Sequence, residues 1–232
     1  MYLLKNRIKN KIDTVLQSLI SLKNIKEKNS SVKALAYQLY ENNGVLKRNN
    51  VSEYLKNLTQ NDRKILRDLG VKFGRYHIFL YKLIKPEPVT IRTLLWKTYH
   101  QKYFKLKPPT FGLNFINDTD NKNRNFMLLC GFEKFDNFFV RVDILERLFM
   151  LIINSGSEEN KEIKLVPEML NLLGCSKENF KKLIKKMDYL VTEKDGNILF
   201  KYAPKRKLKK PFIKKSKNKE NPFEILKNLN LN

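Results

Sequence analysis

Five lysines lie close together between positions 177 and 186, and phosphate binding is the chemistry that this residue type at this spacing could perform. Among them, Phe180, Leu183 and Ile184 recur at helical spacing and form an apolar stripe. The ammonium groups occupy the positions that the stripe leaves free, where they can meet the phosphates of a nucleic acid. These candidate binding residues are Lys177, Lys181, Lys182, Lys185 and Lys186. Because solvated helix faces are also commonly lysine-rich, the alternative is an ordinary surface helix.

A second basic stretch predicts a disordered basic tail over residues 203–232. Residues 201–232 hold eleven basic side chains against two glutamates. Its candidate nucleic-acid-binding residues are Lys205, Arg206, Lys207, Lys209 and Lys210. The last part differs, because an Asn-Pro pair that suits a helix start precedes apolar residues at roughly helical spacing. These residues, Phe223, Leu226 and Leu229, predict a short docking segment for this chain or for a partner protein.

Catalytic and metal-binding patterns are absent from the sequence. It contains no GxxxxGK[ST] loop to hold nucleotide phosphates and no paired acidic motif for magnesium. Cys130 and Cys175 are far apart and form no CxxC motif, while His77 and His100 have no ligand-like neighbours. We therefore expect no catalytic residue, no metal site and no cofactor, so that the chain alone is not an enzyme.

The charge of the chain points to a polyanionic partner. Its 47 Lys and Arg residues outnumber 23 Asp and Glu residues, which gives a formal net charge of +24. Nucleic acid is the first partner that such a charge predicts. Abundant Lys, Asn and Ile are also typical of an AT-rich genome, which is the alternative explanation. No run approaches the roughly 18 apolar residues of a membrane span, so we expect a cytoplasmic protein without a membrane partner.

Signals in residues 127–202 predict the layout of a winged helix. Asp143 is expected to cap a first helix. Pro167 at a first helical turn and Gly174 after a last one bound a second helix. Ser176 can cap the lysine-rich third helix. Asp195-Gly196 between two apolar runs then predicts a β-hairpin over 189–193 and 197–202. Two strands, over 126–132 and 138–142, are expected before the first of these helices.

The first 105 residues predict a helical accessory domain. One long helix is expected within residues 1–28, followed by shorter helices over 31–40, 51–58 and 59–69. Ser31 is expected to cap the helix over 31–40, and a capping box of Thr59 and Asp62 is expected to open the helix over 59–69. Gly70 is expected to end the last of these in a left-handed conformation. Another helix is expected over 76–84, then an elbow at Pro86 and Pro88, and then a helix bearing Ile91.

The predicted fold class is therefore mainly α, with a winged-helix-like α+β module and a disordered tail. The expected divisions are a helical domain over 1–105, a linker over 106–126, the winged-helix-like module over 127–202 and the basic tail over 203–232. Within the helical domain, six aromatic side chains are expected to be mainly core, with a stacking surface for single-stranded bases as the alternative. They are Tyr76, Phe79, Trp96, Tyr99, Tyr103 and Phe104.

The run LRDLGVKFGRYHIFLYKLIKPEPVTIRTLLW, over 66–96, resembles the post-motor region of superfamily 2 helicases similar to the mitochondrial degradosome RNA helicase, in the form found in alphaproteobacteria. Segments 32–46, 138–148 and 221–231 resemble the same family. The two motor domains of that family have no counterpart in this sequence.

The resemblance implies a nucleic-acid-binding accessory region, with RNA as the expected ligand, that supports an ATP-dependent helicase in a bacterial cytoplasm. The motor would act in cis or in trans, ATP and magnesium would belong to it, and a ribonuclease is a further candidate partner in RNA degradation. Two alternatives stay open: an independent winged-helix DNA-binding regulator, and a basic ribosome-associated scaffold protein.

Overall fold

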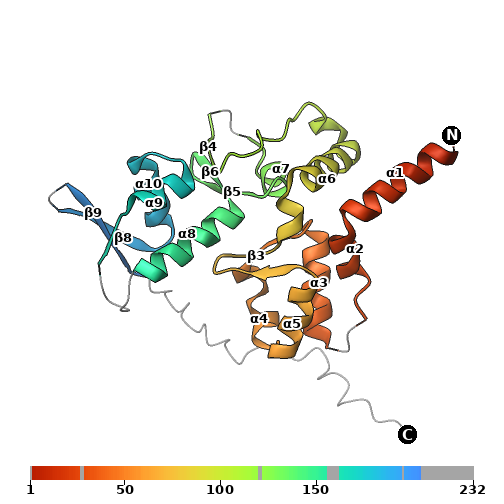
Figure 1. The fold of residues 1–232 in the computed structure, drawn as a ribbon, viewed down its shortest axis with the longest axis horizontal. Helices are drawn as coiled ribbons and strands as arrows, with labels where there is room; N and C mark the ends of the chain where they lie inside the picture. Colours follow the sequence, from red (N-terminus) through yellow and green to blue (C-terminus); the bar gives the residue numbers. More distant parts are fainter. Residues whose placement is uncertain (1, 27–28, 120–121, 156–161, 195, 205–232) are drawn as a thin grey trace, which may run out of the picture.

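A computed structural model of the chain describes residues 2–26, 29–119, 122–155, 162–194 and 196–204. The described residues form a mixed α+β fold with three antiparallel sheets of three strands each. Helix α1 projects from the body, and the β8–β9 hairpin lies at the opposite end (Figure 1). The predicted basic tail from residue 205 onward, with its candidate lysines and its docking segment, lies outside the described residues.

The N-terminal half combines helices with the first sheet. Its elements in chain order are α1 (Tyr2–Val15), α2 (Gln17–Lys23), α3 (Ser30–Glu41), β1 (Val45–Lys47), η1 (Arg48–Val51), α4 (Ser52–Lys56), α5 (Gln60–Asp68), β2 (Val71–Phe73), β3 (His77–Leu80), η2 (Tyr81–Ile84), α6 (Pro86–Tyr99) and η3 (Gln101–Tyr103). The sheet order is β1-β3-β2, and its side chains share one apolar core with α2 to α5.

The C-terminal half contains the other two sheets. Its elements are β4 (Phe115–Asn117), α7 (Arg124–Leu129), β5 (Phe132–Phe135), β6 (Phe138–Arg141), α8 (Val142–Ser155), β7 (Ile163–Lys164), α9 (Pro167–Leu173), α10 (Lys177–Lys186), β8 (Tyr189–Lys194) and β9 (Asn197–Tyr202). The sheets have the orders β4-β6-β5 and β7-β9-β8. Helices α8, α9 and α10 and the β7-β9-β8 sheet enclose one core.

Three of the predicted helix boundaries are confirmed because they depend on local signals. Thr59 and Asp62 form the capping box that starts α5, each side chain accepting a hydrogen bond from the backbone of the other. Gly70 follows α5 with φ +92°, and Gly174 ends α9 with φ +67°, the left-handed conformation in which glycine is favoured.

The prediction of a helix over residues 76–84 is wrong. His77–Leu80 is the central strand β3, paired on both sides, and Tyr81–Ile84 is a 3₁₀ turn. All four strand residues are buried, so no polar alternation marks them as a strand. The expected elbow is confirmed at Lys85, which is extended before Pro86, but it does not continue to Pro88. Helix α6 already begins at Pro86, where a missing N–H costs no helical hydrogen bond.

Five further differences concern the bounds and types of elements. Asp143 does not cap α8, because the helix begins one residue earlier, at Val142. Residues 124–129 form the helix α7 instead of a strand, because the Asn123 side chain caps it by accepting the Phe126 N–H at 2.9 Å. The predicted long N-terminal helix is divided at Leu16 into α1 and α2. Asn29, not Ser31, caps α3, and the predicted linker over 106–126 contains strand β4, which pairs with β6.

Candidate nucleic-acid interface

Helix α10 presents its lysines outward because its opposite side is fixed in the core. The Ser176 side chain caps the helix by accepting the Asn179 N–H at 3.3 Å. Phe180, Leu183 and Ile184 are fully buried, and the Phe180 ring packs edge-on against Phe200 of β9. The predicted apolar stripe is therefore the face that anchors this helix.

The five candidate lysines of α10 differ in exposure and in pairing. Lys177, Lys182, Lys185 and Lys186 are exposed, whereas Lys181 is half-buried and forms an ion pair with Glu193 of β8. Lys186 lies 2.9 Å from a carboxylate oxygen of Asp136. Among the described residues, Lys177, Lys182 and Lys185 have no ion-pair partner, and Lys177 follows the helix cap directly beside the acidic Glu178. Lys182 and Lys185 are therefore the cations most available to an external phosphate.

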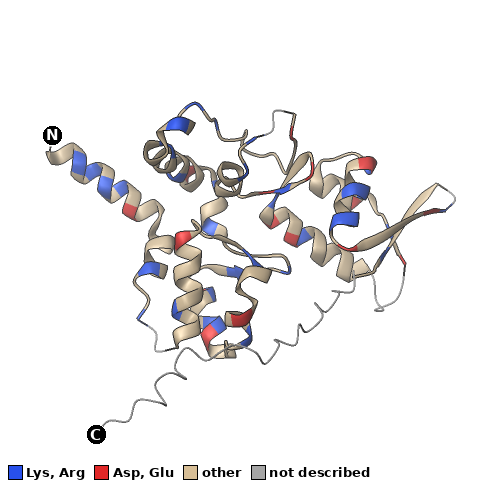
Figure 2. Ribbon diagram, turned by 180° about the vertical axis from the view of Figure 1, so that it is seen from behind, with Lys and Arg blue, Asp and Glu red and all other residues tan. Residues whose placement is uncertain are grey.

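The β8–β9 hairpin adds charge of both signs beside α10. Lys194 and Lys201 are exposed, and Lys194 pairs with Glu162 at 3.2 Å. Figure 2 shows Lys and Arg residues grouped on α10 with few acidic residues on that helix. The helix, rather than the hairpin, therefore carries the uncompensated positive charge of this region.

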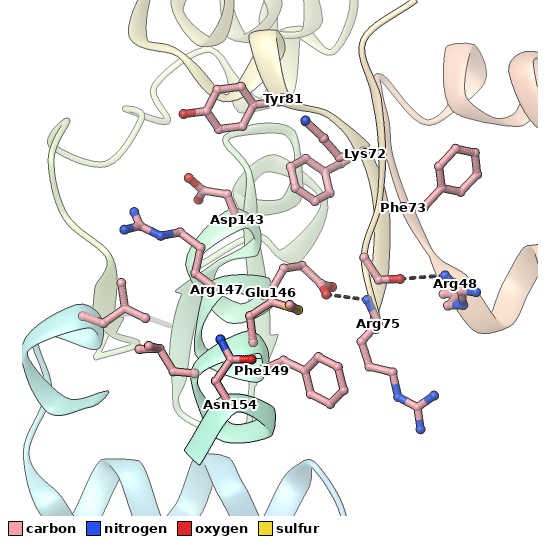
Figure 3. Close-up of a pocket in the computed structure, with 15 residues that line it drawn as sticks. Arg48, Lys72, Phe73, Arg75, Tyr81, Asp143, Glu146, Arg147, Phe149 and Asn154 are labelled. Atoms are coloured by element: carbon pink, nitrogen blue, oxygen red, sulfur yellow. Dashed lines mark hydrogen bonds between the residues drawn. The ribbon is translucent and has the colours of Figure 1, made fainter. Parts of the chain in front are cut away.

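A cleft lies between the β2–β3 hairpin and α8, and nothing in the sequence pattern predicted it. Its volume is about 710 Å³, within the usual range of roughly 300–1,000 Å³ for ligand pockets. Lys72 and Tyr81 lie toward one end and Phe149 and Asn154 toward the other, as Figure 3 shows. Arg147 of α8 lies on the side opposite the hairpin. We call this space the β3–α8 cleft.

Glu146 of α8 joins the two walls of the β3–α8 cleft. Its carboxylate accepts hydrogen bonds from three consecutive backbone N–H groups, those of Arg75 at 2.5 Å, Tyr76 at 2.9 Å and His77 at 2.8 Å. Opposite this carboxylate, the Arg48 guanidinium donates to the Gly74 carbonyl at 2.7 Å. The turn of the hairpin is therefore held from both sides.

Behind the turn, a buried chain of charged groups links the first sheet to β5. The Nε2 atom of His77 lies 3.1 Å from Glu133 Oε2, and Lys47 Nζ lies 2.9 Å from Glu133 Oε1. Burial by itself raises the pKa of Glu133, but His77 and Lys47 outweigh burial and lower this pKa to about 2. Burial likewise opposes charging of His77, yet Glu133 and Glu146 raise its pKa above the ordinary value. The contact between His77 and Glu133 therefore favours the ionised form of each side chain.

Positive charge is concentrated at the hairpin side of the cleft. The pKa of Arg48 is lowered first by burial and then by the neighbouring guanidinium groups of Arg63 and Arg75. Arg75 also places its guanidinium 5.8 Å from the centre of the Phe149 ring, and its Nη2 lies 3.5 Å from the Tyr202 hydroxyl at the end of β9. This corner of the cleft therefore adjoins the base of the β8–β9 hairpin.

The six aromatic residues considered for stacking do not form one surface. Phe79 is buried, and Tyr76, Trp96 and Tyr103 are half-buried, in line with a core function. Trp96 and Tyr103 stack with ring centres 5.2 Å apart. Only Tyr99 and Phe104, which are 84% and 62% exposed, offer open faces at the end of α6.

The cysteines do not provide a nucleophile. Burial raises the pKa of Cys130 to about 12 and that of Cys175 to about 11, so both are thiols at neutral pH. In the described ranges, no group of three or more His, Cys, Asp and Glu side chains is arranged to hold a metal ion. Over the same residues, no helix is both long enough and apolar enough to cross a membrane.

A scan against protein-family models and searches of curated proteins and of solved structures found no match to this chain.

Proposed function

We propose that residues 127–202 contain a winged-helix module that binds nucleic acid through α10 and the β8–β9 hairpin. The observation that carries this proposal is the element order α8-β7-α9-α10-β8-β9 with the sheet order β7-β9-β8. This is the arrangement in which the third helix of a winged helix commonly meets a groove and the hairpin meets the backbone. The exposed lysines of α10 occupy the corresponding surface.

Binding by this surface is electrostatic and has little sequence preference. Lys182 and Lys185 end in compact ammonium groups that suit phosphate oxygens and make no bidentate contact with base edges. Asn179, the polar side chain that could read a base, is half-buried, and its Nδ2 lies 3.4 Å from Asn117 Oδ1. Specific operator recognition by a DNA-binding regulator is therefore the less favoured function.

We further propose that the chain is an accessory region of an ATP-dependent RNA helicase. Support for this comes from the resemblance of residues 66–96 to the post-motor region of that helicase family. In such an arrangement the chain holds RNA near a motor that supplies ATP hydrolysis, and RNA is the preferred ligand. The direct test is to add the chain to the candidate motor and to measure RNA-stimulated ATP hydrolysis and unwinding. A motor with identical rates in the presence and absence of this chain contradicts the proposal.

The binding surface is tested with Lys182→Glu/Lys185→Glu. Both side chains are exposed, so the variant should keep the melting temperature of the parent, while its affinity for a labelled RNA falls by about tenfold or more. The matched control is Lys33→Glu/Lys56→Glu, which reverses the charge of two exposed lysines on α3 and α4. Equal affinities of both variants would show that α10 has no special part in binding.

A further inference from the structure

The β3–α8 cleft has cations whose charge is not matched by its carboxylates. Both oxygens of Asp143 are engaged by Arg141, at 2.7 and 3.1 Å. The Glu146 carboxylate is engaged by three backbone N–H groups of the hairpin turn. Lys72 and Arg147, which are exposed at the cleft, form no ion pair with any residue in the described ranges. Four cations line the cleft, Arg48, Lys72, Arg75 and Arg147, against the two carboxylates of Asp143 and Glu146, so an anionic ligand would meet a net positive charge there.

The same cleft presents aromatic faces next to these cations. Tyr81 is 41% exposed, with Lys85 Nζ 4.9 Å from the centre of its ring. Phe149, at the other end in Figure 3, is half-buried beneath the Arg75 guanidinium. Planar rings beside basic groups suit a ligand that alternates flat bases with phosphates, because bases stack on rings while phosphates pair with cations.

We propose that the β3–α8 cleft binds a segment of single-stranded nucleic acid, with bases against Tyr81 and Phe149 and phosphates on Lys72, Arg75 and Arg147. A single strand is favoured because the base faces of a duplex are stacked on one another and cannot reach a side-chain ring. This inference rests on the proposed function, because it assumes that the chain binds nucleic acid. The cleft would be a second binding site, separate from the α10 surface.

The cleft adjoins the proposed winged-helix module. The Arg75 Nη2 atom lies 3.5 Å from the Tyr202 hydroxyl at the end of β9, so one corner of the cleft lies beside the base of the β8–β9 hairpin.

The test compares two labelled RNAs, an unstructured 12-nucleotide oligouridylate and a blunt-ended duplex. With the full chain at 200 mM salt, Lys72→Glu/Arg147→Glu should weaken oligouridylate binding by about tenfold or more and change duplex binding by less than about twofold. Tyr81→Ala should weaken only oligouridylate binding, by about fivefold, through lost stacking. Lys33→Glu/Lys56→Glu is the control for charge alone.

The outcomes separate this inference from the proposed function. Unchanged oligouridylate binding by Lys72→Glu/Arg147→Glu overturns the cleft site, even where Lys182→Glu/Lys185→Glu weakens duplex binding. An equal loss for both RNAs overturns the assignment to a single strand. If Lys182→Glu/Lys185→Glu binds both RNAs like the parent while the cleft variants lose the oligouridylate, the cleft stands and the α10 surface fails. Uridine monophosphate that binds the cleft as tightly as the oligouridylate would identify a free-nucleotide site and contradict the strand.

Discussion

The carboxylate of Glu146 lies where a β-carbon on Gly74 would have to be. An ideal Cβ built at position 74 falls 2.5 and 2.6 Å from the two carboxylate oxygens, closer than real Cβ atoms come to other atoms. Only glycine lets the carboxylate reach the N–H groups of Arg75, Tyr76 and His77. This pair of residues therefore fixes the β2–β3 hairpin on α8 and sets the shape of the β3–α8 cleft.

Gly74→Ala is expected to destabilise the fold by about 1–3 kcal/mol, because the new methyl group must displace the Glu146 carboxylate from its three donors. Gly74 has no positive φ, so backbone strain adds nothing to this cost. Chemical denaturation monitored by circular dichroism gives the free energy of unfolding.

The same substitution made in a Glu146→Ala background separates this explanation from a general packing effect. Once the carboxylate is gone, Gly74→Ala should cost well below 1 kcal/mol, and the double-mutant cycle should show a coupling of about 1 kcal/mol or more. If the free-energy costs of the two substitutions are additive, the contact between Gly74 and Glu146 is not the reason that position 74 requires glycine.

Gly70→Ala tests a different property of glycine. With φ +92°, this position disfavours any L side chain, whereas its Cβ would meet only the Leu80 side chain, at 3.9 Å. We expect a loss of about 1 kcal/mol from backbone conformation alone. A thermal melt in which the variant and the parent coincide would contradict this expectation.

The His77–Glu133 pair should make stability depend on pH in two directions. The pKa of Glu133 is lowered to about 2 from an ordinary value of 4.5, so its contribution is full above pH 4.5 and is lost as pH falls toward 2. We expect the loss to be on the order of 2 kcal/mol. The pKa of His77 is raised above 6.5, so its contribution is full below pH 6.5 and is lost as pH rises through the folded pKa.

Denaturation profiles of the parent and of Glu133→Gln between pH 2 and 9 check both directions. The Glu133→Gln variant should lose most of the decrease in unfolding free energy that the parent shows at acid pH. Because His77 then faces one carboxylate fewer, the decrease in stability at higher pH should begin at a lower pH in the variant than in the parent. If the parent and Glu133→Gln give parallel profiles, this pair does not govern the pH dependence.

Local signals in the sequence predicted much of the fold, and contacts between distant residues account for what it missed. Pro167, Gly174 and Ser176 bound α9 and α10 because caps and turns are decided by a few neighbouring residues. The sequence pattern predicts a helix at strand β3 because a short, fully buried apolar run has no periodicity that distinguishes a strand from a helix.

The same distinction between local signals and distant contacts applies to the candidate site. The lysine face of α10 follows from helical spacing within ten residues, so the sequence predicted it. The β3–α8 cleft and the buried His77–Glu133 pair were not predicted, since Glu133 and Glu146 are 56 and 69 positions from His77. No signal within the Gly74-Arg75 turn identifies Glu146 as its acidic partner.

The docking segment predicted at Phe223, Leu226 and Leu229 lies outside the described residues and is tested directly. If residues 203–220 form the predicted flexible tether, these eighteen residues span about 23 Å on the square-root chain estimate, enough to reach a neighbouring protein. Phe223→Ala/Leu226→Ala should lose the partners that the parent recovers from a native lysate in high salt, where the lysines are screened. Recovery of the same proteins by both chains would show that these side chains do not anchor a partner.

The most direct test of nucleic-acid binding through α10 is the salt dependence of RNA affinity for the parent and for Lys182→Ala/Lys185→Ala. If about six phosphates are neutralised, the parent should lose roughly three decades of affinity between 50 and 200 mM salt. The variant should lower the slope of log K against log salt by about 2, one unit for each lost phosphate contact. A parent affinity that does not respond to salt, or a variant with the parent's slope, would contradict the assignment of α10 as the binding surface.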